Sequence, residues 1–450
     1  MSYNLHTTWQ FVLLFFGLVI FAFISWKKPV WGGWLIIFCS PLYLLKIGSW
    51  PLTVLEALIW VFVFVWLIKK IQLYCHPGLD PGSRLIRAWI PAFAGMTKEG
   101  TERIIKSKLF WPILLVLAGV LISTIFSPDL KAGLGILKSW FLAPIIFAAI
   151  FNNVLGEKDG VKVFFSALLA SGAAVATISA GYFFFSRLTF DGRLSAFYLS
   201  PNHLAMFLAP GLLAGVGLWL ETKRIYQKAF LFFVSCFLLL VLCFTYSYGA
   251  WLGLFAAAAF VLFYFWKYKI INRKHLFLIS CFLFLAFAFM LFSQMYGAHS
   301  DKLAGLFTSS RSSWQSRLMI WQAAGKILED NWILGIGPGM FQRYYLEYQK
   351  YFSVPYLEWA VPQPQNLFLA WWMQAGLLGL AGFIWLLVIF FRQAFKSLNK
   401  IPSWPAIFLA AMMVYVLVHG LADTTFWKND LALVFWIIVF LCYKAGHRAY

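Results

Sequence analysis

Long apolar runs separated by short polar segments dominate the pattern of this chain. Runs of roughly 17–25 apolar residues can cross a hydrocarbon core of ~30 Å as helices. The sequence predicts such spans near residues 9–26, 30–47, 52–68, 109–127, 133–151, 161–182, 203–220, 227–246, 249–266, 276–295, 367–391, 404–421 and 431–443. Because neighbouring short runs can merge, the pattern predicts an all-α polytopic membrane protein with 12 to 13 transmembrane helices.

One long polar and aromatic segment, residues 296–365, interrupts this pattern. It predicts a large, partly helical loop outside the cytoplasm, between an N-terminal transmembrane bundle (1–295) and C-terminal transmembrane helices (366–450). Within the loop, helical spacing predicts a helix over residues 313–328. Its apolar face should contact the bundle or the lipid interface. That face comprises Trp314, Leu318, Trp321, Gly325 and Leu328.

Composition excludes the soluble globular class. Hydrophobic residues make up 62% of the chain and charged residues only 12%, and the mean hydropathy is +0.80. Soluble domains carry about a quarter charged residues. The predicted fold therefore requires a membrane as its solvent.

The net charge of +20 follows the positive-inside pattern of membrane proteins and does not indicate a nucleic-acid partner. Of the 36 Lys and Arg residues, 24 lie in loops that alternate spans would place in the cytoplasm. This bias predicts that residues 128–132, 186–202, 246–248, 296–365 and 422–430 share the opposite side. The bacterial cytoplasmic (inner) membrane is the expected location, with the site facing outward.

Residues 75–97 differ in composition from the rest of the chain. They resemble a translated bacterial repetitive element and lie within the predicted cytoplasmic loop 71–108. Their prolines and Pro-Gly pairs disfavour a stable helix. We expect this insert to be irregular and functionally silent.

The cysteines supply no disulfide framework and no metal-ligand spacing. Five of the six fall within predicted spans. No carboxylate pair has convincing metal spacing either. The sequence therefore predicts no metal and no cofactor.

Polar residues of possible functional use gather on the predicted outer side. Arg193 is either an interfacial arginine that reaches the headgroups or a fixed cation facing a phosphate. Lys138, near the outer end of its span, either reaches the headgroups or helps to hold an anionic one. Arg317 borders the predicted buried face of its helix, as a solvated charge or as a ligand contact. Asn202 lies where the next span begins and can cap it.

Further along the outer loop, Gly335-Ile-Gly-Pro-Gly predicts a tight turn and lacks the spacing of a nucleotide-binding loop. The many tyrosines that follow suit either sugar stacking or membrane-interface contacts. Asp423 is either a partner for a loop arginine or an ordinary helix-end aspartate.

Several motifs in this order resemble the O-antigen ligase and polymerase superfamily of bacterial envelope glycosyltransferases. The motifs are Gly192-Arg193…Pro201-Asn202, Tyr246-Ser247-Tyr248-Gly249-Ala250-Trp251, Arg317…Trp321, Gly335-Ile-Gly-Pro-Gly-Met-Phe and Asn366-Leu-Phe-Leu…Gly376-Leu-Leu-Gly. The resemblance implies transfer of a glycan from undecaprenyl pyrophosphate, a lipid-linked oligosaccharide donor, to lipid A-core, a growing polysaccharide or a protein. It also implies that Arg193 and Arg317 bind the pyrophosphate and stabilise its departure without a metal.

The chain departs from the family pattern at two positions. Gln365-Asn366 stands where the family commonly has His-Asn, and Ser247-Tyr248-Gly249 stands where it has Ser-Arg-Gly. Gln365 can orient a hydroxyl but cannot take its proton at neutral pH. Besides Gln365 and Asn366, the candidate catalytic residues are therefore other potential bases, namely His299, His203, Glu347 and Glu358.

Two other functions remain open at this stage. A polysaccharide or lipid transporter would show charges near the bilayer midplane and internal repeats, and the sequence shows no clear repeat. A non-catalytic envelope assembly protein on the same scaffold would be compatible with glutamine at position 365.

Overall fold

The computed structural model describes residues 3–5, 8–48, 50–74, 107–155, 160–270, 274, 313–352, 358–400 and 403–447. The elements are β1 Tyr3–Leu5, α1 Thr8–Lys27, α2 Pro29–Phe38, η1 Ser40–Leu44, β2 Leu45–Ile47, α3 Val54–Tyr74, α6 Phe110–Ile125, α7 Leu130–Ile136, η2 Leu137–Leu142, α8 Ala143–Val154, α9 Gly160–Phe184, α10 Pro201–Glu221, α11 Ile225–Cys243, α12 Tyr248–Lys267, α15 Ser313–Asn331, α16 Phe341–Glu347, η3 Tyr348–Tyr351, α17 Leu367–Lys400, α18 Trp404–His419 and α19 Asn429–His447. The insert 75–97 and the predicted span 276–295 lie outside the described residues.

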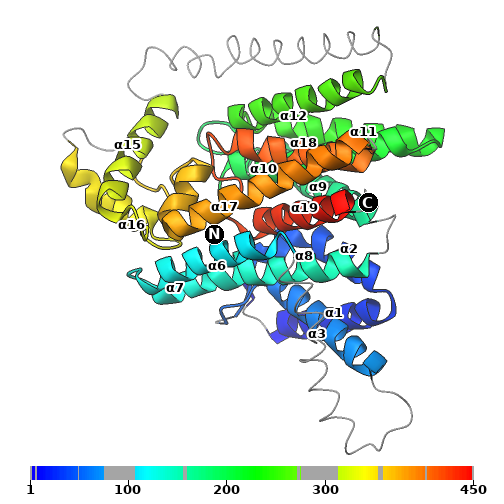
Figure 1. Cartoon of the computed structure of the whole chain (residues 1–450), viewed down its shortest axis with the longest axis horizontal. Coiled ribbons are helices and arrows are strands. Elements are labelled where there is room, and N and C mark those ends of the chain that lie inside the picture. The colour runs from blue at the N-terminus through cyan, green and yellow to red at the C-terminus, as the bar shows by residue number, and fades with distance from the viewer. Residues whose placement is uncertain are drawn as a thin grey trace, which may run out of the picture.

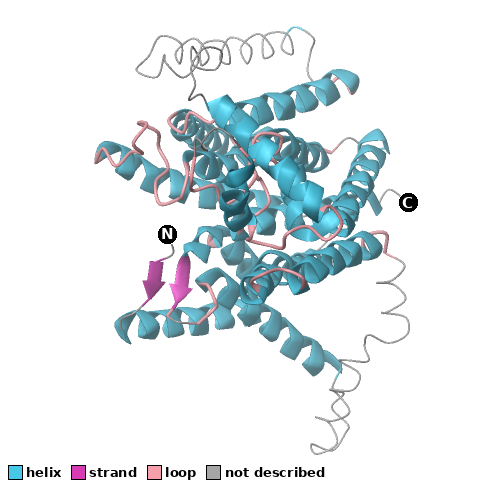
Figure 2. Cartoon of the chain, turned by 90° about the vertical axis from the view of Figure 1, so that its left-hand side faces the viewer, coloured by secondary structure: helices cyan, strands magenta, loops and turns pink. Residues whose placement is uncertain are grey.

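The predicted fold class is confirmed, because the chain is a bundle of apolar helices (Figures 1 and 2). Among the described residues, seven helices are long and apolar enough to cross a membrane. They run over Thr8–Lys27, Leu130–Val154, Gly160–Phe184, Pro201–Glu221, Ile225–Cys243, Tyr248–Lys267 and Leu367–Asn399. Three shorter apolar helices, α2, α6 and α18, accompany them. The count of 12 to 13 spans stays a prediction.

The predicted span over residues 30–47 is wrong. The helix there, α2, has ten residues and rises only about 15 Å, half the thickness of a hydrocarbon core. Pro41 has no N–H to continue the helical hydrogen bonding, and the chain passes through η1 into β2. Strand β2 pairs in parallel with β1 (Figure 2).

The loops predicted on the outer side do meet at one end of the bundle. Hydrogen bonds join the loop 185–200 to residue 245, and the starts of α10 and α15 to the turn 420–424. Basic loops predicted on the other side meet at the opposite end, where Lys162 pairs with Glu221 at 2.8 Å. In Figure 1, α15 and α16 lie at the left end of the bundle and the C-terminus lies towards the right. Loops predicted to share a side thus meet at the same end of the bundle, and which end faces the cytoplasm stays a prediction.

The helix predicted over 313–328 is present as α15, but its predicted buried face is wrong. The buried residues are Ile320, Ala323, Ala324 and Ile327, together with Leu328. Trp314 and Leu318, expected on the apolar face, are 46% and 38% exposed. α15 packs against α16, η3 and α17. The small side chains of its alanines allow this close approach, and Trp321 packs at the edge of the buried face while Trp314 is exposed.

Helix α17 is broken where the Gly335 turn contacts it. Gly376 interrupts the helix with φ 66° and ψ −177°, and the N–H of Ile336 donates to the carbonyl of Met373 at 2.7 Å. A Cβ on Gly335, which has φ +71°, would lie 2.3 Å from that same carbonyl oxygen. The two glycines allow the turn to dock against the helix, so the tight turn predicted from Gly335-Ile-Gly-Pro-Gly is confirmed.

The substitution Gly335→Ala should destabilise the protein by at least about 2 kcal/mol, because alanine pays for a left-handed backbone and also clashes with the Met373 carbonyl. The measurement is the midpoint of thermal unfolding in detergent micelles. Gly325→Ala in α15 is the matched control, since a Cβ there meets nothing within 4 Å and should be neutral or stabilising by about 0.5–1 kcal/mol. Equal midpoints for the two variants would contradict the docking described here.

Candidate active site

The turn after α18, residues 420–423, is the point where the outer end of the bundle is joined. Each of its four residues accepts a hydrogen bond from a different group of another segment. The bonds are Leu367 N to Gly420 O (2.7 Å), Asn366 Nδ2 to Leu421 O (3.0 Å), Arg317 Nε to Ala422 O (3.0 Å) and Asn202 Nδ2 to Asp423 Oδ2 (2.8 Å). The turn therefore brings together α10, α15 and α17, which are far apart in the sequence.

Arg193, in the loop between α9 and α10, is held in a fixed orientation. Its Nε donates to the carbonyl oxygen of Thr245 at 2.8 Å, and its Nη2 donates to Asn202 Oδ1 at 2.7 Å. Asn202 in turn donates to Asp423, while Asp191 lies 3.9 Å from Nη1. The side chain of Arg193 is one-fifth exposed.

The two arginines Arg193 and Arg317 act on each other electrostatically. Burial lowers the pKa of Arg193, Asp191 raises it, Arg317 lowers it and Asp423 raises it again. A guanidinium stays protonated through shifts of this kind. The fold thus holds two like charges near each other, with two aspartates as partial compensation.

Both guanidinium groups are anchored in the same way, by Nε on a backbone carbonyl. An arginine has five N–H donors, and the two hydrogen bonds of Arg193 use only two of them. Its terminal nitrogens retain donors of the geometry that binds phosphate oxygens. The arrangement is therefore suited to an oxyanion with more than one negative charge.

Three other predicted site residues lie at the same end of the bundle. Tyr248, the first residue of α12, is within electrostatic range of Arg193. Asn366 caps α17, because its Oδ1 accepts from the N–H groups of Phe368 and Leu369 at 3.0 and 3.1 Å. Gln365, half-buried, has a left-handed backbone with φ 47°. Strain of this kind in a non-glycine residue persists only where the surrounding structure enforces it.

Lys138 belongs to a different set of contacts. Its Nζ lies 3.3 Å from a carboxylate oxygen of Glu56 and also donates to the carbonyl of Pro51. Glu56 is 2% exposed and forms a reciprocal capping box with Thr53 at the start of α3. Thr53-Val-Leu-Glu56 is a sequence signal that could have revealed this partner.

The potential bases occupy different environments. Glu347 pairs with Arg343 at 2.9 Å on the exposed face of α16. Glu358 accepts a hydrogen bond from Ser316 Oγ at 2.5 Å. Ser316 directly precedes Arg317 in the chain. His203 is 2% exposed, and His299 lies outside the described residues. Among these bases, Glu358 is hydrogen-bonded to the residue that precedes Arg317 in the chain.

His203 forms a buried polar cluster that sequence reasoning did not find. Its Nε2 lies 3.3 Å from Asp430 and 3.4 Å from the hydroxyl of Tyr43, and its ring contacts the ring of Tyr198. Burial raises the pKa of Tyr198, and so does the charge of Asp430. Burial lowers the pKa of Lys428, while Asp430 and Asp423 raise it. These contacts hold the first turn of α10, which carries Asn202.

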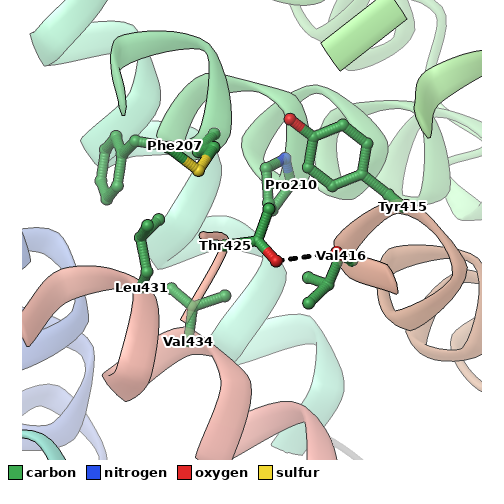
Figure 3. Close-up of a pocket in the computed structure, with 8 residues that line it drawn as sticks. Phe207, Pro210, Tyr415, Val416, Thr425, Leu431 and Val434 are labelled. Atoms are coloured by element: carbon green, nitrogen blue, oxygen red, sulfur yellow. Dashed lines mark hydrogen bonds between the residues drawn. The ribbon is translucent and has the colours of Figure 1, made fainter. Parts of the chain in front are cut away.

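A small cavity between α10, α18 and α19 does not serve as the site (Figure 3). It is lined by Met206, Phe207, Pro210, Tyr415, Val416, Thr425, Leu431 and Val434. Its volume of about 10 Å³ has room for about one water molecule. Thr425 Oγ1 donates to the carbonyl of Val416 at 2.7 Å beside it. This cavity is therefore too small for any ligand larger than water.

The donor set offers no metal centre in the part of the chain that the structure describes. No three His, Cys, Asp or Glu side chains there are grouped as metal ligands. Positive charge at the arginine site comes from guanidinium groups.

The fold is that of a polytopic α-helical membrane protein, and two arginines are hydrogen-bonded to backbone carbonyls at one end of it. An O-antigen ligase family model matches residues 231–384, about a third of the chain, and this match supports membership of the O-antigen ligase superfamily. The matched range contains Arg317, Gln365 and Asn366, whereas Arg193 and Asp423 lie outside it. A comparison with curated proteins finds no match. The family supports O-antigen ligase-like glycan transfer from a lipid-linked donor to a glycan acceptor.

If the Lys138–Glu56 pair is structural, Lys138→Met and Glu56→Gln should each destabilise the protein by about 1–3 kcal/mol. The double variant should lose less stability than the sum of the two single losses, because neither side chain is left without its partner. Unfolding midpoints of the four proteins in a double-mutant cycle measure this coupling. Two results would contradict a structural pair and support a role of Lys138 in anion binding. One is additive losses of stability, and the other is a Lys138→Met variant that loses pyrophosphate binding at unchanged stability.

Proposed function

We propose that the chain transfers a glycan from undecaprenyl pyrophosphate to an acceptor at the outer face of the cytoplasmic membrane. The diphosphate binds between Arg193 and Arg317. The observation that supports this most is the pair of guanidinium groups, held near each other by backbone carbonyls and by the Asn202–Asp423 link. Holding two like charges together costs free energy, and a diphosphate offsets that cost.

In this reaction the acceptor hydroxyl attacks the anomeric carbon of the donor sugar, and the bond from that carbon to the diphosphate oxygen breaks. Negative charge develops on the leaving diphosphate. Preorganised donors stabilise such charge without reorganising at the moment of reaction. The arginine pair therefore supplies the main catalytic effect, and no metal is required.

The proton of the acceptor hydroxyl passes to a carboxylate, and Glu358 is the best-placed described candidate because of its bond to Ser316 beside Arg317. Gln365 orients the hydroxyl through its amide. This assignment accounts for a site in which glutamine replaces the histidine that the superfamily commonly has. The acceptor is lipid A-core, a growing polysaccharide or a protein.

Deleting the gene in the source bacterium should change the chain-length profile of its surface glycan. Long glycan accumulating on the lipid carrier would identify a ligase, and glycan stalled at single repeat units would identify a polymerase. The measurement is gel electrophoresis of surface and carrier-linked glycan, with a plasmid-borne copy of the gene as the control. An unchanged profile would contradict the transferase and favour an assembly protein or a transporter.

Arg193→Lys and Arg317→Lys should each lower the rate of glycan transfer by about 10²-fold or more, since each removes a preorganised fork of donors from the transition state. The assay follows release of undecaprenyl pyrophosphate by the purified protein in vesicles. Arg343→Lys, on the exposed face of α16, is the matched control and should keep the wild-type rate. Addition of EDTA should leave the rate unchanged.

In the same assay Glu358→Gln should lower the turnover number more than it raises the KM for the donor. Wild-type rates for both lysine variants would exclude the arginine pair as the diphosphate site. A wild-type rate for Glu358→Gln would exclude only Glu358 as the base.

A further inference from the structure

Three consecutive apolar residues after α15 are exposed at a turn that is not helical. Trp332, Ile333 and Leu334 are 53%, 53% and 38% exposed. They follow the last turn of α15, where Lys326 and Glu329 form an exposed ion pair. The chain thus changes from charged to fully apolar within three residues, without entering a protein core. We refer to residues 332–334 as the apolar turn.

The apolar turn is continuous with the apolar outer surface of the transmembrane helices. The N–H of Leu377 donates to the carbonyl of Ile333 at 2.9 Å, and Leu377 and Leu378 are 40% and 38% exposed. On its other side, Gly337 lies against Ser127, which follows Phe126, itself 69% exposed. Exposed apolar residues therefore continue from α17 onto the apolar turn. An apolar surface of this extent indicates contact with a membrane or another protein.

Two carbonyl groups of the apolar turn accept hydrogen bonds from α17. Non-helical backbone in hydrocarbon must find its hydrogen bonds within the protein. Trp372 Nε1 donates to Trp332 O at 2.7 Å and Leu377 N donates to Ile333 O at 2.9 Å. These bonds attach the apolar turn to α17, a helix long and apolar enough to cross a membrane.

We infer that the apolar turn inserts into the membrane, at the boundary between acyl chains and headgroups on the arginine-site side. The helix from Leu377 to Lys400 has 24 residues and is about 36 Å long. This length exceeds a hydrocarbon core of ~30 Å, so its first residue, bonded to Ile333, lies at the edge of the core. Tryptophan is enriched at that depth. The loop between α15 and α16 is thus anchored in lipid.

The test replaces Ile333 with the photoreactive residue p-benzoylphenylalanine in the full chain, reconstituted into phosphatidylcholine–phosphatidylglycerol vesicles. The same replacement at Glu329, four residues earlier and 62% exposed, is the matched control. Benzophenone abstracts hydrogen from neighbouring C–H bonds, so a group placed among acyl chains becomes joined to lipid. Irradiation followed by mass spectrometry of the intact protein measures the adducts.

The expected result is a phospholipid adduct at position 333 with a yield on the order of tenfold above that at position 329, because only the former partitions into acyl chains. Equal lipid yields would overturn the inference and place the turn in water. An adduct between two copies of the chain would also overturn it, in favour of a protein interface. Neither result depends on glycan transfer, so the proposed function can stand or fall separately.

Discussion

The turn formed by residues 420–423 is the interaction on which the outer end of the molecule depends. Its carbonyls and the Asp423 carboxylate are fixed by the end of α18, and each accepts from a donor on another segment. Backbone carbonyls at a helix end have no partner within the helix. Here those acceptors orient an arginine and the starts of α10 and α17. The same groups that terminate one helix therefore assemble the site.

The arginine pair illustrates a balance between stability and function. Arg193 and Arg317 repel each other, while Asp191 and Asp423 partly neutralise them. Because Nε of each guanidinium is fixed on a carbonyl, the side chains cannot relax freely into separate solvated positions. Charge held in this way interacts strongly with an anion and costs little reorganisation when the anion's charge grows. The energetic cost in the unliganded protein is consistent with a role in stabilising a leaving diphosphate.

The break in α17 joins two parts of the molecule with different surroundings. Before Gly376, the short helical segment begins at Asn366 beside the arginines and buries Trp371 against Phe141 and Phe426. After Gly376, the helix is long and apolar, and its first N–H bonds to the apolar turn. Gly376, with its positive φ, changes the direction of the chain between the segment that contacts the 420–423 turn and the long apolar helix. Hydrogen bonds at this break thus fix the residues around Asn366 relative to the long apolar helix.

The sequence by itself determined the class of the protein, because apolar runs and the distribution of basic residues depend on local composition alone. It also predicted which loops share an end, the tight turn at Gly335 and the candidate Arg193, Asn202 and Asp423 that the fold brings together. Tertiary structure decided the rest. Close packing of the alanines of α15 set its buried face, and Lys138 forms an ion pair with Glu56. The acceptors of the 420–423 turn are mostly backbone carbonyls, which every residue possesses, so no side-chain pattern could reveal them.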